Sequence, residues 1–259
     1  MREFLEDALS HRDDGYGRAQ KHVQRELPKR FYKDVGVAPV EGGYVVTLDG
    51  RQTRTPTKVP VVVPHLELAQ RMASEWHGQG EFVDPDLMPH VRLINSGIEG
   101  GAGARDALVA EVVKFCGSDL LLYRADSPRE LVARQEEVWD DALVRVARHF
   151  SVAFEPTVGI LHKEQSAETL ERLEAAIAGV DHLTATALVS VTGIMGSGVL
   201  AIALYAGLVD PEEAWTAAHV DEDYQISNWG EDYEASERRK KRRVEFDAAV
   251  NVIGWLKAT

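Results

Sequence analysis

The longest apolar stretch of the chain covers residues 183–209 and carries no charged side chain. Its length would allow a membrane span. However, serines and threonines are frequent in it, and Gly193, Gly196 and Gly198 cluster at its middle, where a helix breaks most easily. We therefore expect two short helices that meet at these glycines and are buried on nearly all sides, with no membrane insertion.

A β pattern fills residues 35–63, where apolar and polar positions alternate. Asp49-Gly50 marks a hairpin turn, because both central positions of a type I′ turn need positive φ. Residues 51–55 and 59–63 are expected return strands, and the second should lie at a sheet edge because Pro60 cannot donate to a ladder. Such short strands bury little alone, so the sheet should pack against the helical part.

Beyond Pro64 the apolar spacing changes to the helical period of 3.6. Ser127-Pro128 and Asp210-Pro211 resemble capping boxes that open helices, and Ser166 and Asp181 are expected N-caps. Residues 119–124 and 152–161 read as extended pieces, and the second segment could add to the N-terminal sheet. The helices are expected near residues 66–77, 91–98, 108–115, 128–150, 166–178, 183–209, 211–218 and 231–256.

These patterns predict an α+β protein with a small N-terminal antiparallel β domain at residues 28–64, packed on a larger C-terminal α-helical domain at residues 65–259. Residues 1–27 are polar and are interrupted by glycines, so a flexible arm is expected there. Four residues are expected to be structural: Asp49 and Gly50 in the hairpin turn, and Trp76 and Trp139 on the apolar faces of their helices.

The sequence of 259 residues has a formal net charge of −13. This argues against a nucleic-acid binder, which needs a basic face for phosphate contacts. The single cysteine, Cys116, excludes an internal disulfide framework and a cysteine-rich zinc site, and it indicates a reducing compartment. The glycines of residues 193–198 lack the lysine of a phosphate loop, and the histidines form no ligand set, so no metal or cofactor is expected.

The densest acidic patch contains Asp221, Glu222, Glu231 and Asp232, with Trp229 among them. A solvated helix-capping face is one interpretation, and a docking surface for a basic or amide-rich partner is another, because an aromatic residue amid charges is a plausible anchor. The carboxylates between residues 221 and 232 could also serve a metal-assisted hydrolase. The basic run at residues 238–243 indicates an ion-paired helix, because glutamates lie one turn before it.

Short motifs follow one another along residues 28–256 in a specific order and spacing. They are Arg30-Phe31-Tyr32-Lys33, Leu48-Asp49-Gly50-Arg51, Thr55-Pro56, Glu75-Trp76, Gln79, Pro85, Met88-Pro89, Tyr123-Arg124, Gln135, Trp139, Asp221-Glu222, Gln225, Trp229-Gly230-Glu231-Asp232 and Arg238. Together they resemble the assembly chaperones for the α subunit of the F-type ATP synthase catalytic head. The match departs at His90-Val91 and Ile98-Glu99, in a loop and a short helix.

The resemblance implies the same α+β fold, no enzymatic activity and no cofactor. It implies a protein that binds the new α subunit before that subunit pairs with β, and we expect this protein to be a monomer. Members act in the mitochondrial matrix or in the bacterial cytoplasm, and the N-terminal residues look unlike a transit peptide, so the bacterial cytoplasm is expected. The expected partner-binding residues are Glu222, Asp221, Trp229, Glu231 and Asp232, with Glu222 first because the family motif has a glutamate there.

Overall fold

The computed structural model describes residues 27–257, so the arm predicted for residues 1–27 lies outside the described residues except for its last position. A three-stranded antiparallel sheet opens this part of the chain, with the order β1 (Val35–Val40), β2 (Gly43–Leu48) and β3 (Arg51–Gln52). Asp49 and Gly50 have φ values of 48° and 77°, which makes the predicted hairpin turn between β2 and β3. The small N-terminal sheet is therefore confirmed.

The strand predicted for residues 59–63 is wrong, and β3 ends after two residues. Residues 53–63 instead make isolated bridges, of which Tyr44 with Val63 is the most regular: each amide donates to the other's carbonyl, at 2.8 and 2.9 Å. Pro60 has no N–H and Lys58 adopts a φ of 71°, so a continuous ladder cannot form on this edge.

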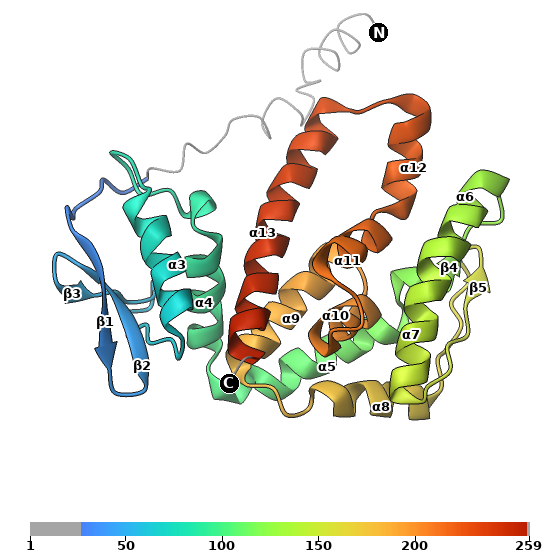
Figure 1. Cartoon of the computed structure of the whole chain (residues 1–259), viewed down its shortest axis with the longest axis horizontal. Helices are drawn as coiled ribbons and strands as arrows, with labels where there is room; N and C mark the ends of the chain where they lie inside the picture. The colour runs from blue at the N-terminus through green and yellow to red at the C-terminus, as the bar shows by residue number, and fades with distance from the viewer. Residues whose placement is uncertain (1–26, 258–259) are drawn as a thin grey trace, which may run out of the picture.

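Helix α3 (Leu66–His77) packs on β1 and β2, and α4 (Pro89–Gly100) lies beside it (Figure 1). Two side chains before the sheet are tied to the end of α3: Tyr32 Oη donates to the Trp76 carbonyl at 2.7 Å, and Arg30 Nη1 donates to the Gln79 carbonyl at 2.5 Å. The predicted boundary between the β domain and the helical domain at residue 64 stays a proposal. Helix α3, which follows that boundary, packs directly on β1 and β2.

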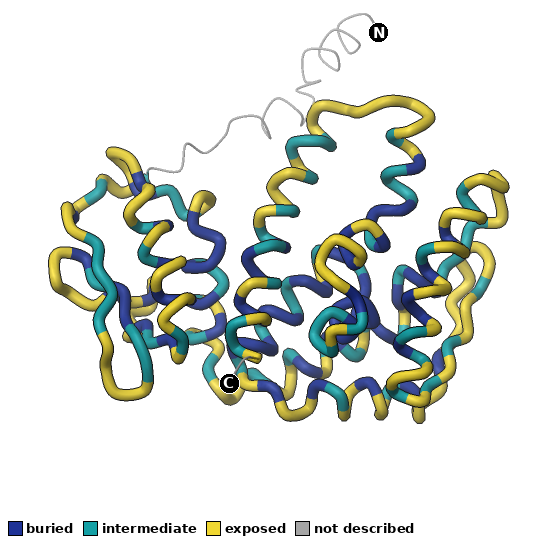
Figure 2. The backbone as a smooth tube through the Cα atoms, viewed as in Figure 1, coloured by how far each residue is buried: buried dark blue, intermediate teal, exposed yellow. Residues whose placement is uncertain are grey.

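Further helices form the larger part of the molecule, with α9 at its centre (Figure 1). They include α5 (Arg105–Gly117), α8 (Ala167–Ile177), α9 (His182–Met195), α10 (Gly198–Ala206), α11 (Pro211–Ala218), α12 (Val220–Trp229) and α13 (Tyr233–Lys257). Helix α9 contacts α4, α5, α10 and α13, and Figure 2 shows buried residues concentrated there. The α+β class and the central helix pair are therefore confirmed, whereas α12 has no counterpart among the predicted helices.

The apolar stretch at residues 183–209 divides into α9 and α10 at its glycine cluster, as predicted. Gly196 has a φ of 66° and caps the end of α9, and the Ser197 hydroxyl accepts from the Leu200 amide to open α10. The resulting helices have 14 and 9 residues. Within residues 27–257, no helix is both long and apolar enough to cross a membrane.

Residues 129–150 form one continuous helical segment: α6 (Arg129–Gln135), the π-helical turn η4 (Glu136–Asp140) and α7 (Asp141–Phe150).

The capping box predicted at Ser127 is wrong, because the Ser127 hydroxyl donates to Asp126 and the N-cap position falls on Pro128. The box at Asp210 is confirmed, since Asp210 and Glu213 exchange both side-chain-to-amide hydrogen bonds at 2.8 Å. The predicted N-caps Ser166 and Asp181 are also confirmed.

The extended pieces in the middle of the chain do not join the N-terminal sheet. Strand β4 (Tyr123–Arg124) pairs in parallel with β5 (Thr157–Val158), at the other end of the molecule from β1–β3 (Figure 1). Helices α6 and α7 make the crossover between the two strands and hold them beside the helical domain. Three single 3₁₀ turns complete the fold: η1 (Pro85–Leu87), η2 (Ala102–Ala104) and η3 (Leu120–Leu122).

Candidate functional site

The five predicted partner-binding residues lie on the hairpin of α12 and α13 (Figure 1). Asp221 and Glu222 are in the first turn of α12, where carboxylates favour the positive end of the helix dipole. Trp229 ends that helix, and Glu231 and Asp232 lie in the turn before α13. At about 1.5 Å per residue, some 12 Å of helix separate the two groups. The structure therefore places them at opposite ends of α12.

Asp221 is fixed from outside its own helix. Gln135 of α6 donates from Nε2 to Asp221 Oδ1 at 2.7 Å, while its Oε1 accepts from the Ala125 amide at 2.8 Å. The Gln135 side chain is buried, so its amide depends on these partners rather than on solvent. Asp221 therefore joins α12 to α6, and this contact occupies one of its carboxylate oxygens.

Glu222 is held more loosely than its neighbours. Arg239 of α13 lies 2.5 Å from Asp223 Oδ1 but 4.0 Å from Glu222 Oε2, and His219 Nε2 is 3.9 Å from the same glutamate oxygen. Burial is the main cause that lowers the pKa of His219, which keeps its ring neutral near pH 7. With no close cationic partner and a side chain 34% exposed, Glu222 is the carboxylate of this turn that is freest to meet a partner.

Two aromatic rings are exposed at the tip of the hairpin. Trp229 is 78% exposed, and Tyr233, across the turn, is also 78% exposed. Gly230 has a φ of 82°, which lets the chain reverse between them. Sequence analysis missed Tyr233, although its spacing of four residues from Trp229 in an acidic turn was visible. The two rings make the hairpin tip partly apolar, although its sequence is dominated by acidic residues.

The acidic side chains of the same turn cap the start of α13. Asp232 Oδ1 accepts from the Ala235 amide, and Glu231 Oε2 accepts from the Ser236 hydroxyl, both at 2.9 Å. Both carboxylates remain exposed. The helix-capping interpretation therefore describes their local contacts. Because both side chains are exposed, the other oxygen of each carboxylate faces solvent and is available to a partner.

The basic run of α13 is an ion-paired helix, as predicted. Pairs within the helix are Arg238 with Glu234, Lys240 with Glu237, and Arg243 with Asp247, at 3.6, 2.8 and 2.7 Å. Arg239 and Arg243 also reach carboxylates of α12 and α11. These positive charges are largely balanced at the surface, so they do not form a phosphate-binding face.

Trp139 of η4 lies in the core and contacts α11. Its side chain is completely buried, its Nε1 donates to the Ala217 carbonyl at 2.8 Å, and the Arg124 guanidinium lies 5.2 Å from its ring centre. The indole therefore joins three segments that are distant in sequence. This environment suits the structural role expected for it.

Trp76 and Asp49 organise the β part of the molecule. The Trp76 ring packs edge-to-face on Tyr32 with ring centres 5.6 Å apart, and it is partly rather than fully buried. Asp49 Oδ1 accepts from the amides of Asp34 and Lys33 at 2.8 and 3.0 Å, and these hydrogen bonds lower the pKa of the Asp49 carboxyl. Asp49 thus closes the hairpin against the chain that enters the sheet.

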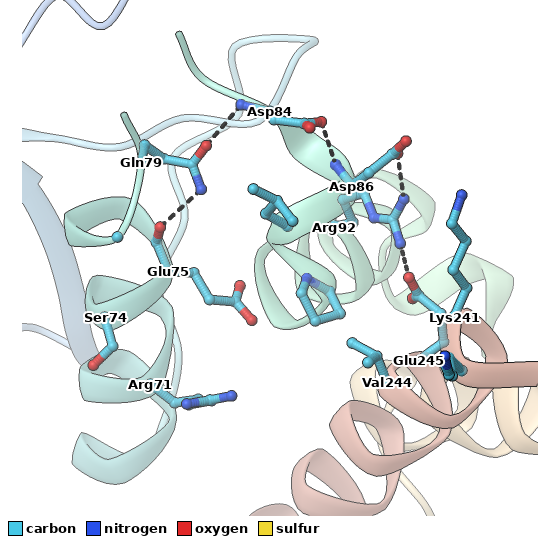
Figure 3. Close-up of a pocket in the computed structure, with 14 residues that line it drawn as sticks. Arg71, Ser74, Glu75, Gln79, Asp84, Asp86, Arg92, Lys241, Val244 and Glu245 are labelled. Atoms are coloured by element: carbon cyan, nitrogen blue, oxygen red, sulfur yellow. Dashed lines mark hydrogen bonds and ion pairs between the residues drawn. The ribbon is translucent and has the colours of Figure 1, made fainter. Parts of the chain in front are cut away.

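A cleft of about 770 Å³ lies between α3–η1–α4 and α13 (Figure 3). Its carboxylates are engaged within the protein. The buried Glu75 carboxylate accepts from the His90 amide and ring at 3.1 and 2.6 Å and from the Val91 amide at 2.9 Å. Arg92 bonds both Asp86 and Glu245.

The metal-assisted hydrolase left open by the acidic run predicted converging carboxylates between residues 221 and 232. The structure instead spreads them over both ends of α12 and commits several of them to caps and ion pairs. Across residues 27–257, no three histidine, cysteine, aspartate or glutamate side chains are grouped so that they could hold a metal ion. No observation here favours the hydrolase.

Comparison with known proteins gives consistent matches. A family model described as ATP12 chaperone protein matches residues 29–147. A crystal structure of a putative chaperone from Agrobacterium tumefaciens has a TM-score of 0.85 and 42% identity, covering 97% of this chain and 94% of that one. Atp12 from Paracoccus denitrificans has a TM-score of 0.81 and 34% identity, covering 88% of this chain and 98% of that one.

A curated relative extends the match to eukaryotes. The mitochondrial protein atp12 of Schizosaccharomyces pombe is 23% identical over 214 residues, which cover 78% of this chain and 74% of that protein. The TM-scores of 0.85 and 0.81 show that the two bacterial structures share the fold of this chain over most of its length. The chain therefore belongs to the ATP12 family of chaperones, which act in the assembly of ATP synthase.

Proposed function

We propose that this protein binds the unassembled α subunit of the F-type ATP synthase and covers the surface that α later presents to β. Membership in the ATP12 family supports the proposal. A subunit made for an oligomer exposes a partly apolar interface, which aggregates if it is left bare. A chaperone must cover such a surface with moderate affinity and then yield to the permanent partner.

The observation that carries the proposal is the exposed aromatic pair Trp229 and Tyr233 at the tip of the α12–α13 hairpin, each 78% exposed. Large exposed rings are the common anchors of protein interfaces, while surrounding charges tune the encounter. Glu222, Glu231 and Asp232 supply those charges on the same hairpin. Asp221 contributes by holding α12 in place through Gln135.

The protein acts as a monomer without catalytic activity in this proposal. One chain carries the whole hairpin tip, so no second copy is needed to complete the surface. The carboxylates that would serve hydrolysis are engaged in caps and ion pairs, which supports a binding role. Two of the matched structures come from bacteria, and this favours the bacterial cytoplasm as the place of action.

The decisive experiment is co-elution of the full chain with isolated α subunit in size-exclusion chromatography, with isolated β subunit as the control. A complex with α and none with β is the expected result. Light scattering of α during dilution from denaturant tests protection directly, because the chaperone should suppress aggregation at equimolar concentration. Equal binding to both subunits, or to neither while α stays soluble, would refute the proposal.

A further inference from the structure

The cleft between α3–η1–α4 and α13 is lined by elements that hydrogen bonds and ion pairs hold in place (Figure 3). On one wall Gln79 donates to the Glu75 carbonyl at 3.0 Å and accepts from the Asp84 amide at 2.7 Å. Arg92 reaches from α4 to Asp86 at 3.2 Å and across to α13. These bonds fix η1 and the two helices relative to each other, so the cleft is present before any partner arrives.

Two cations in the cleft are not used by the fold. Arg71 on α3 and Lys241 on α13 are exposed, and within residues 27–257 neither side chain makes a hydrogen bond or ion pair. The cleft carboxylates Glu75, Asp86 and Glu245, by contrast, are already bonded to His90 or Arg92. The fourth carboxylate of the lining, Asp84, accepts from the Asp86 amide at 3.0 Å, and Lys240 pairs with Glu237. Among the described residues, Arg71 and Lys241 are therefore the charged side chains of the cleft that have no bonded partner.

Exposed apolar side chains belong to the same lining. Leu87 of η1 is 64% exposed and Val244 of α13 is 51% exposed, and both line the cleft. A volume of about 770 Å³ has room for several side chains of a bound segment. Exposed apolar groups that share a cleft with unpaired cations match a segment that carries carboxylates beside a large apolar residue.

We propose that this cleft binds an acidic, apolar-containing segment of the same client polypeptide, the ATP synthase α subunit, as a second contact beside the hairpin tip. Arg71 and Lys241 pair with its carboxylates, and its apolar side chain packs between Leu87 and Val244. The proposal rests on the proposed function. Charge complementarity supports it. The position of the cleft also supports it, because α13 carries Tyr233 at the hairpin tip and Lys241 about two turns later, so one client could reach both.

The test is the full-length double variant Arg71→Glu/Lys241→Glu, compared with the control Lys114→Glu/Arg148→Glu, which makes the same charge change at exposed positions outside the cleft. Affinity for isolated α subunit is measured by calorimetry at two salt concentrations, and light scattering reports self-association. We expect about tenfold weaker binding for the cleft variant, a smaller salt dependence, and near-normal binding for the control. The conservative Arg71→Lys/Lys241→Arg variant should retain affinity.

Each other outcome has a definite meaning. Unchanged binding of the cleft variant, while the wild type binds α, overturns the cleft assignment and leaves the proposed function intact. Equal weakening in the control means that only overall charge matters and also overturns it. A change in self-association without a change in α binding makes a second copy the occupant and contradicts the proposal. Failure of the wild type to bind α refutes both proposals. Circular dichroism confirms that the variants are folded.

Discussion

Gln135 and Asp221, 86 positions apart in sequence, form a hydrogen bond of 2.7 Å that joins α6 to α12. Because Gln135 is buried and Asp221 is only partly exposed, this bond positions the helix that carries the acidic turn. Both residues belong to motifs by which the chain resembles its family, and the structure gives them a shared role.

Replacing Asp221 should therefore act through stability. Asp221→Ala leaves the buried Gln135 Nε2 without its acceptor, which should lower the free energy of unfolding by about 1–3 kcal/mol. Asp221→Asn keeps an acceptor oxygen and should cost less than about 1 kcal/mol. Urea denaturation of both variants measures the difference. Equal stability of Asp221→Ala and wild type would show that the bond does not hold α12.

Glu222→Lys should weaken α binding while the protein stays folded. The Glu222 side chain has no ion pair closer than 3.9 Å, so its loss removes little from the fold, although the new lysine faces Arg239. We expect a drop of about tenfold in affinity for isolated α subunit, and a melting temperature close to that of wild type. Glu168→Lys, at an exposed position on α8, is the control. Unchanged folding and unchanged binding would refute the acidic-surface proposal.

The exposed rings at the hairpin tip should dominate the affinity. Trp229→Ala/Tyr233→Ala removes two side chains that are each 78% exposed, so unfolding free energy should change by less than about 0.5 kcal/mol. Binding to α should fall by about thirtyfold or more, as expected for a central interface anchor. Ile160→Ala, at a side chain 95% exposed, is the matched apolar control. A tip variant that binds like Ile160→Ala would remove these rings from the interface.

Two glycines of the central apolar stretch should respond in opposite ways to alanine. A Cβ at Gly198 would overlap the Val112 carbonyl oxygen and lie 2.7 Å from the Cys116 sulfur, where α10 crosses α5. Gly198→Ala should therefore cost about 1–3 kcal/mol or more. A Cβ at Gly193 meets nothing within 4 Å inside α9, so Gly193→Ala should be neutral or stabilise by up to about 1 kcal/mol. Thermal melts of the pair measure the difference, and equal effects would contradict the close packing.

Asp119 should give the protein a specific pH dependence. Its side chain is completely buried, and this burial raises the pKa of its carboxyl from 3.8 to about 6, although the Val199 and Leu121 amides donate to it. A carboxyl pKa that is higher in the folded state means that the folded protein binds the proton more tightly. The contribution of Asp119 to stability is thus fully present below about pH 3.8 and is lost as pH rises through about 6.

The measurement compares wild type with Asp119→Asn, which keeps an acceptor oxygen but cannot ionise. The unfolding free energy of wild type relative to the variant should fall by about 2.4 kcal/mol between about pH 4 and pH 7. Urea denaturation at several pH values gives this difference, and the subtraction removes the contribution of the other carboxylates. A difference that stays constant with pH would contradict the raised pKa.

The sequence by itself determined the elements whose stabilising interactions are local. The Asp49-Gly50 turn, the Asp210 capping box, the Ser166 and Asp181 caps and the helix break at Gly196 all rest on φ preferences or on hydrogen bonds within a few residues. Such signals are legible in one chain because both partners lie in the same short segment. The family resemblance could also be found from the sequence, because the order and spacing of the motifs are properties of the sequence alone.

Only the tertiary structure decided where distant segments meet. Residues 59–63 have strand-like composition but form only isolated bridges, and β5 pairs with β4 instead of the N-terminal sheet. The bond of Gln135 to Asp221, the exposed tip with Tyr233 and the cleft holding Arg71 and Lys241 combine side chains from separate helices. These arrangements depend on how α9 and its neighbours pack. Packing energy comes from side-chain shape across long sequence separations, which no local pattern encodes.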